Sequence, residues 1–167
     1  MGTQTVKRIL YATDLSDNAR VAGDYALQLS NDCQAHLTIV SVVPDEAEEM
    51  SVNMGYDLAA HYDSETLESF SQNAMDQRRE ELIERINNLC STMKNRSIDD
   101  PACPKISIKF GDPVEQILLE AKSDGADLIV LGARGHSLLD DILIGSVANG
   151  VVKKSLIPVV TVPQVET

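Results

Sequence analysis

The sequence carries the segment Ile129-Val130-Leu131-Gly132-Ala133-Arg134-Gly135-His136-Ser137, and the pair Gly145-Ser146 follows it. An apolar run that ends in Gly-x-x-Gly predicts a buried strand leading into a loop, because glycine lets the backbone approach a neighbouring group closely. We expect that neighbouring group to be a phosphate.

The residues after Gly145 support an anion site. Residues 146–154 read as a helix with Ser146 at the N-cap and two lysines in the last turn. The start of a helix offers unpaired N–H groups and a partial positive charge, so a glycine loop facing it forms an anion cradle. The two commonest phosphate loops, Gly-x4-Gly-Lys-Ser/Thr and Gly-x-Gly-x-x-Gly, are both absent.

The rest of the chain alternates between strand and helix patterns. Strands are predicted at 7–13, 35–43, 105–110, 127–131 and 157–162. Helices are predicted at 18–31, 61–96, 113–124 and 146–154, the second with a break or frayed start within 64–71. In helix 18–31 the apolar face is predicted to hold Val21, Ala22, Tyr25, Ala26 and Leu29. This alternation predicts right-handed crossovers and an α/β fold, a parallel five-stranded sheet with helices on both faces.

Composition bounds the class of protein. At 167 residues and 43% hydrophobic content, the chain is predicted to be one domain over 1–167, with a flexible insertion or lid at 44–60. Three cysteines without ligand spacing, and no signal-peptide core, predict reduced thiols in a cytoplasmic protein. No apolar run reaches membrane-spanning length. A net charge of −12 argues against nucleic-acid binding, so an anionic ligand must be captured locally.

In open parallel sheets, ligands bind beyond the carboxyl ends of the strands, where the strand order reverses. Asp14 follows the first predicted strand, and the loop 132–137 follows the fourth. These two segments face one crevice if the two strands are neighbours, which the sequence alone does not establish.

The spacing Gly132-x2-Gly135-x9-Gly145-Ser146 resembles the nucleotide signature of the universal stress protein family, in its ATP-binding branch. The resemblance extends from Lys7 to Pro163 and includes Ile-Leu-Tyr-Ala-Thr-Asp near the start and Gly-Asp-Pro before the third helix. It implies a single Rossmann-like domain with strand order 3-2-1-4-5, in which the first and fourth strands are neighbours.

The resemblance also implies contacts with the ligand. Asp14 and Ala12 would meet the adenosine, Val42 the adenine through its backbone, and Leu131 and Gly132 the ribose. The phosphates, with Mg²⁺ or Mn²⁺ as companion, would be surrounded by Gly135, His136, Gly145, Ser146 and Val147. Many members have proline at the position of Ala12 and histidine at that of Ser41.

Several of these residues also have simpler interpretations. Asp14 can be a helix-start residue, and Ser146 an N-cap that binds phosphate with the same atoms. Arg134 either reaches phosphate or is solvated. We interpret His136 as a loop residue near phosphate and not as a catalytic base, because no nucleophile with an accompanying acid is marked. The sequence marks no catalytic residue and no protein ligand for a metal.

The leading functional prediction is an ATP-binding regulatory protein of the stress response, with slow or no ATP hydrolysis. It is expected to form a homodimer through strand 157–162 and to act on an unidentified regulatory partner. One alternative is a nucleotide-independent dimeric interaction module. Another is an adenylating enzyme of the same architecture, which ranks low because residues 14–18 contain no glycine. The preference among ATP, ADP and AMP stays open.

Overall fold

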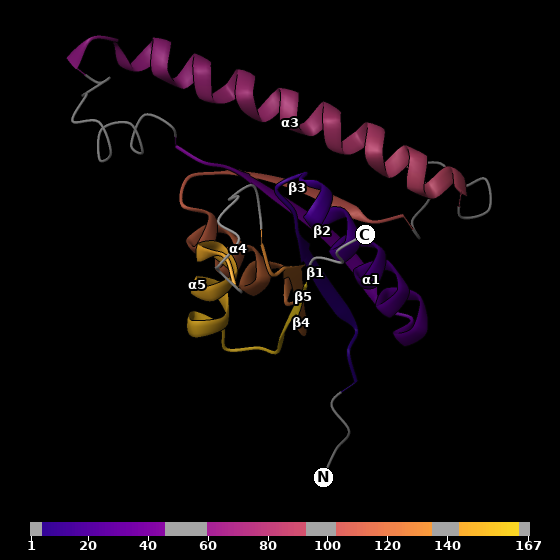
Figure 1. Ribbon diagram of the computed structural model, residues 1–167. Helices are drawn as coiled ribbons and strands as arrows, with labels where there is room; N and C mark the ends of the chain where they lie inside the picture. The colour runs from indigo at the N-terminus through magenta and orange to yellow at the C-terminus, as the bar shows by residue number, and fades with distance from the viewer. Residues whose placement is uncertain (1–4, 46–59, 93–102, 135–143, 164–167) are drawn as a thin grey trace.

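The computed structural model describes residues 5–45, 60–92, 103–134 and 144–163, and these form a sheet flanked by helices (Figure 1). The strands are β1 (Arg8–Ala12), β2 (His36–Val43), β3 (Lys105–Phe110), β4 (Leu128–Gly132) and β5 (Val159–Val162). The helices are α1 (Asp17–Cys33), α3 (Ser64–Thr92), α4 (Pro113–Asp124) and α5 (Ser146–Lys154). Every predicted strand and helix is present. Most of the predicted insertion at 44–60 lies outside the described residues.

The strands are parallel and run in the order β3-β2-β1-β4-β5, which confirms the predicted fold class and topology. β1 pairs with both β2 and β4, and at its carboxyl end Ala12 lies opposite Val40 on one side and Leu131 on the other. The chain order reverses between β1 and β4, so this is the switch point at which ligands bind in such sheets.

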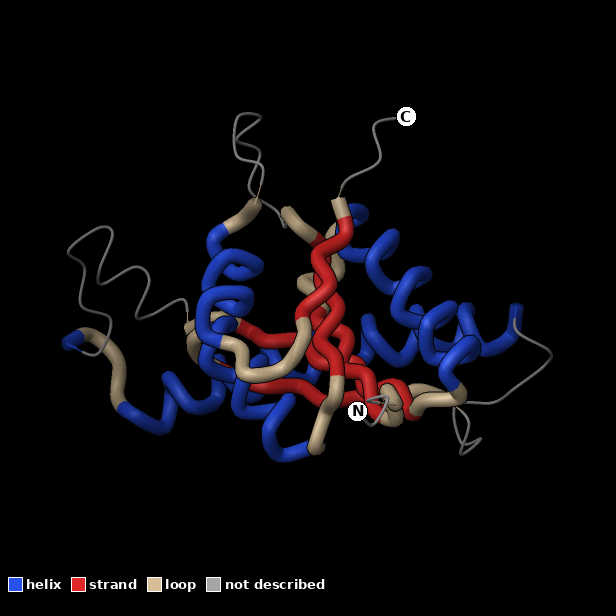
Figure 2. Tube along the Cα trace, turned by 90° about the horizontal axis from the view of Figure 1, so that it is seen from below, coloured by secondary structure: helices blue, strands red, loops and turns tan. Residues whose placement is uncertain are grey.

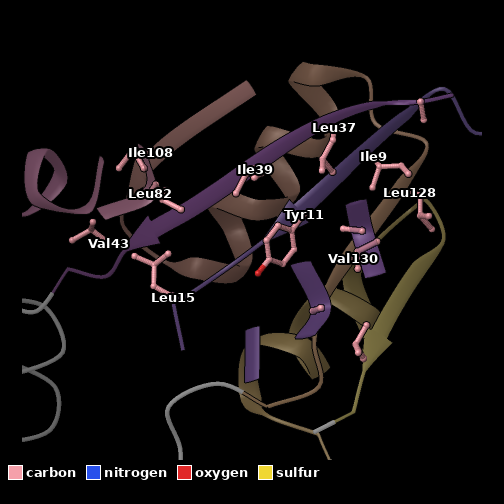
Figure 3. Packing of buried hydrophobic residues seen from close by; sticks show 14 residues of the cluster. Ile9, Tyr11, Leu15, Leu37, Ile39, Val43, Leu82, Ile108, Leu128 and Val130 are labelled. Atoms are coloured by element: carbon pink, nitrogen blue, oxygen red, sulfur yellow. The ribbon is translucent and has the colours of Figure 1, made fainter. Parts of the chain in front are cut away.

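Alternate side chains of each strand enter two separate apolar layers. On β1, Ile9 and Tyr11 belong to the layer under α1 and α3, and Leu10 and Ala12 to the layer under α4 and α5. Figure 2 shows helices on both sides of the sheet, and Figure 3 shows the first layer, in which Leu82 of α3 meets the strands. Because both faces are covered, the inner strands β1 and β4 are apolar almost throughout, whereas the outer strand β3 alternates polar and apolar residues.

Two local predictions are wrong. α3 runs without a break from Ser64, where the Oδ1 of Asp63 accepts a hydrogen bond from the Thr66 N–H at 2.8 Å and caps the first turn. Tyr25 is 53% exposed, although its spacing placed it on the apolar face of α1. The buried residues of α1 are Ala19, Ala22 and Ala26, whose small side chains let the helix lie close to the sheet.

The ends of α4 follow the predicted signals. Asp112 is the N-cap and accepts a hydrogen bond from the Glu115 N–H, and Pro113 occupies the first turn. At the other end Gly125 has a φ of 65°, and its N–H closes the helix. A side chain at Gly125 would meet no close neighbour, since the nearest atom, the Nη1 of Arg8, would be 3.7 Å away. The glycine is therefore required by backbone conformation and not by space.

Replacing Gly125 isolates this conformational cost. Gly125→Ala should lower the free energy of unfolding by about 1 kcal/mol, because the Cβ of alanine is strained in the left-handed conformation of this residue. Gly125→Asn should lose less, since asparagine tolerates this region. Urea unfolding at neutral pH measures both variants. Equal stability of Gly125→Ala and the parent protein would show that the helix end is not held in this conformation.

An ion pair between a buried carboxylate, Glu120, and a partly exposed lysine, Lys109, joins α4 to β3. The carboxylate of Glu120 is 5% exposed, and its Oε2 lies 2.8 Å from the Nζ of Lys109. Burial raises the pKa of Glu120, but hydrogen bonds from Lys109 and Ser107 together lower it further, so the net pKa lies below its ordinary value. Glu120 therefore stabilises the fold as an anion.

The pH dependence of this pair has a definite sign. A lowered folded pKa means that the stabilisation is complete above the unfolded pKa of about 4.3 and is lost as the pH falls through the folded pKa. Glu120→Gln should cost about 1–3 kcal/mol at pH 7, and the difference from the parent protein should shrink below about pH 4. Urea unfolding across pH checks this, with the exposed Glu81→Gln as control. A constant difference would contradict the assignment.

Candidate functional site

A cleft of about 290 Å³ opens at the carboxyl ends of β1 and β4, and its wall includes the start of α5. Nine of the eleven predicted site residues line it: Ala12, Asp14, Val42, Leu131, Gly132, Arg134, Gly145, Ser146 and Val147. The other two, Gly135 and His136, lie outside the described residues. The topology thus brings together residues from four separate segments of the chain.

One backbone hydrogen bond joins the two ends of the glycine loop, and another joins its first end to β5. The N–H of Ala133 donates to the carbonyl of Val162 at 2.7 Å, and the N–H of Gly145 donates to the carbonyl of Ala133, also at 2.7 Å. A Cβ on Gly132 would lie 3.1 Å from the carbonyl oxygen of Arg134, closer than most real contacts. The chain therefore leaves β4 in a tight path that glycine fits, and it returns beside the same point.

The N-cap of α5 is Gly145 and not Ser146, which corrects the prediction. Gly145 has the extended φ and ψ of a cap residue, and its carbonyl accepts the N–H of Asn149 at 2.9 Å. Ser146 is consequently the first helical residue; it is exposed, and no side-chain hydrogen bond caps this helix. The N–H groups of the first turn, which begins at Ser146, have no acceptor within the helix, and they lie at its positive end beside the cleft.

Asp14 belongs both to the cleft and to the start of α1. Its Oδ1 accepts hydrogen bonds from the N–H and the Oγ of Ser16, at 3.0 and 2.6 Å. Ser16 is the N-cap of α1 and accepts the N–H of Ala19 at 3.2 Å. Asp14 therefore has the helix-start role of the simpler interpretation. It also lines the cleft.

Ser41 has a structural task next to the cleft. It is fully buried, and its hydroxyl donates to the carbonyl of Thr13 at 2.8 Å. The Thr13 N–H in turn donates to the carbonyl of Val40, so β1 and β2 are joined one residue beyond their ladder. The serine at this position thus fixes the end of β1, from which Ala12 and Asp14 reach the cleft.

Sequence reasoning missed Arg78. This residue lies on α3, lines the cleft and donates from Nη1 to the carbonyl of Asp14 at 3.1 Å. It is 64 residues from Asp14 along the chain, and it carries no motif. Its place four residues before the buried Leu82 was the one available signal, because residues four apart share a helix face.

The charges of the cleft favour an anion. Among the lining residues that the structure describes, Arg78, Arg134 and the positive end of α5 face one acidic residue, Asp14. The described part of the cleft is thus locally positive in a chain of net charge −12. Among the described residues there is no group of three or more His, Cys, Asp or Glu side chains that could hold a metal ion.

Tyr11, next to Ala12 on β1 but in the opposite apolar layer, has a structural role. Burial raises its pKa to about 12, and its hydroxyl donates to the carbonyl of Ala19. The phenol therefore stays neutral at physiological pH, and it ties α1 to the sheet at the point where α1 begins.

The universal stress protein family model matches residues 5–163, and the chain belongs to this family. Among curated relatives, universal stress protein MJ0577 of Methanocaldococcus jannaschii is 28% identical over 156 residues, which cover 93% of this chain and 94% of the relative. Universal stress protein YxiE of Bacillus subtilis is also 28% identical, with 93% and 97% of the two chains covered.

Solved structures share the fold over nearly the whole chain. A structure of MJ0577 has a TM-score of 0.71 and 26% identity, with 98% of this chain and 99% of that chain covered. The universal stress protein UspA from Lactobacillus plantarum has a TM-score of 0.66 and 26% identity, with 96% and 99% covered. A universal stress protein solved in complex with cAMP has a TM-score of 0.57 and 20% identity, with 97% and 100% covered, which shows a common fold. Within the described residues, no helix is both long and apolar enough to cross a membrane.

Proposed function

We propose that the protein binds ATP in this cleft and acts as a nucleotide-dependent regulatory protein of the stress response in the cytoplasm. One observation carries the proposal: residues of the glycine signature, the end of β1 and the start of α5 line one positively charged cleft at the switch point of the sheet. Membership of the universal stress protein family supports it. ATP is the proposed ligand because its phosphates carry the most negative charge toward the positive lining, and ADP and AMP are the alternative ligands.

The lining residues fit the parts of the nucleotide. Ala12, Asp14 and Val42 would hold the adenosine, and Leu131 and Gly132 would flank the ribose. The phosphates would lie against Arg134 and the residues Gly145, Ser146 and Val147, with Gly135 and His136 completing the loop. Backbone N–H groups at a helix start bind phosphate without a protein charge of their own, and Mg²⁺ or Mn²⁺ would be held mainly by the phosphates.

We propose slow or no hydrolysis. Hydrolysis needs a residue that orients or deprotonates the attacking water, and the single carboxylate among the described lining residues, Asp14, already accepts two hydrogen bonds from Ser16. The bound nucleotide would then serve as a signal read by a regulatory protein partner. A protein that binds no nucleotide would instead be an interaction module.

A charge at Ser146 separates binding from folding. Ser146→Asp should leave the fold intact or stabilise it by about 0.3–1 kcal/mol, because an acid at a helix start is favourable. The same charge repels phosphate, so the ATP affinity should fall at least tenfold. Isothermal titration with Mg-ATP, together with urea unfolding, measures both effects.

Asn149→Asp is the matched control. It adds the same charge to the same helix at an exposed position that does not line the cleft, and ATP binding should be unchanged. If Ser146→Asp binds ATP as tightly as Asn149→Asp, the start of α5 is not the phosphate site.

The edge of the sheet supports the proposed homodimer. β5 is an outer strand, and an exposed strand edge is free to pair with a second copy. Beside it Leu156 is fully exposed and Val152 is 46% exposed. We propose that the strand 157–162 and these apolar side chains form the dimer contact.

Leu156→Lys tests the contact. Because Leu156 is fully exposed in one chain, its replacement should leave the stability of the monomer unchanged and weaken the dimer at least tenfold, as a charge would be buried at the interface. Sedimentation equilibrium measures the dissociation constant, with Phe70→Lys, an exposed aromatic on α3, as control. A parent protein that is monomeric at micromolar concentration would remove the proposed dimer.

A further inference from the structure

A polar contact joins the long helix α3 to the cleft. The guanidinium of Arg78 donates to the main-chain carbonyl of Asp14, and Arg78 itself forms part of the cleft wall. The guanidinium of arginine is planar and carries five N–H donors. One hydrogen bond to the carbonyl therefore orients the whole group. A hydrogen bond from a charged donor is also stronger than one between neutral groups.

The carbonyl that Arg78 holds belongs to a constrained loop. Leu15, the next residue, is buried and has a φ of 66°, in the left-handed region that non-glycine residues seldom adopt. The N–H of Leu15 donates to the Oγ1 of Thr13 at 3.1 Å, and Ser16 holds the carboxylate of Asp14. Such a conformation persists only where its surroundings enforce it. Arg78 supplies part of that enforcement from a separate helix.

The described side chains of α3, residues 64–85, dock the helix through a small apolar set. Of its described side chains Leu82 is buried, and Ala74 and Met75 pack partly against the core, whereas Phe70 is 57% exposed. Figure 1 shows the helix lying along one face and extending past the sheet. The polar contact of Arg78 lies on the same face as Leu82, so it adds to the docking of this part of α3.

We infer that Arg78 is a positioning residue for the nucleotide site, which fixes Asp14 and thereby couples ligand binding to the docking of α3. The inference rests on the proposed ATP binding and adds to it the element that responds. Coupling between two sites is reciprocal. A ligand that stabilises the Asp14 loop should therefore also stabilise the docking of α3. Loss of the Arg78 contact should in turn weaken ligand binding.

Titration with Mg-ATP tests the first half. Arg78→Ala should weaken ATP binding about tenfold, and Arg78→Lys should recover about a third of the loss, since lysine keeps the charge without the fork. Arg79→Ala is the matched control, because Arg79 is exposed, adjacent and outside the cleft; its affinity should equal that of the parent protein. Equal affinities of Arg78→Ala and Arg79→Ala overturn the inference.

Amide hydrogen exchange tests the second half, with a readout that a merely structural role would not move. At saturating Mg-ATP, exchange across residues 64–85 should slow at least threefold in the parent protein and in Arg79→Ala, but not in Arg78→Ala. Equal slowing in Arg78→Ala, or none in the parent protein, overturns the coupling while ATP binding stands. A parent protein that binds no ATP removes the proposed function as well.

Discussion

The candidate site depends on the two backbone hydrogen bonds of Ala133. Its N–H extends the pairing of β4 with β5, and its carbonyl receives Gly145, the cap of α5. These bonds bring the exit of β4 and the start of α5 to one place, although twelve residues lie between Gly132 and Gly145. They thereby place the first turn of α5 at the wall of the cleft that the end of β1 also lines.

The electrostatic design follows from this arrangement. The overall charge of an acidic protein repels a polyphosphate, so attraction of the proposed ATP must come from positive groups close to it. The start of α5 and the side chains of Arg78 and Arg134 line the cleft and supply positive charge at short range. The acidic chain repels anions in general, whereas the cleft attracts them locally. This combination favours an anion whose shape matches the cleft.

Local signals in the sequence predicted the elements well, and for physical reasons. Asp112-Pro113 and Gly125 act within a turn of the helix they bound, so their effect does not depend on the rest of the chain. The adjacency of β1 and β4 was different, because pairing between distant strands leaves no local mark; the family resemblance supplied it. Tyr25 was wrongly assigned to the buried face of α1. Its spacing identifies the face, but it does not show that α1 lies so close to the sheet that only alanines are buried there. Arg78 was missed because its partner is a backbone carbonyl, which any residue offers.

One measurement bears most directly on the proposed function. The purified protein would be denatured, and the released small molecules identified by chromatography and mass spectrometry, followed by calorimetric titration of the nucleotide-free protein with Mg-ATP. ATP in the released fraction, or saturable binding at one site per chain, is the expected result. The absence of any adenine nucleotide, together with no heat of binding at millimolar ATP, would contradict it and leave the cleft without its proposed ligand.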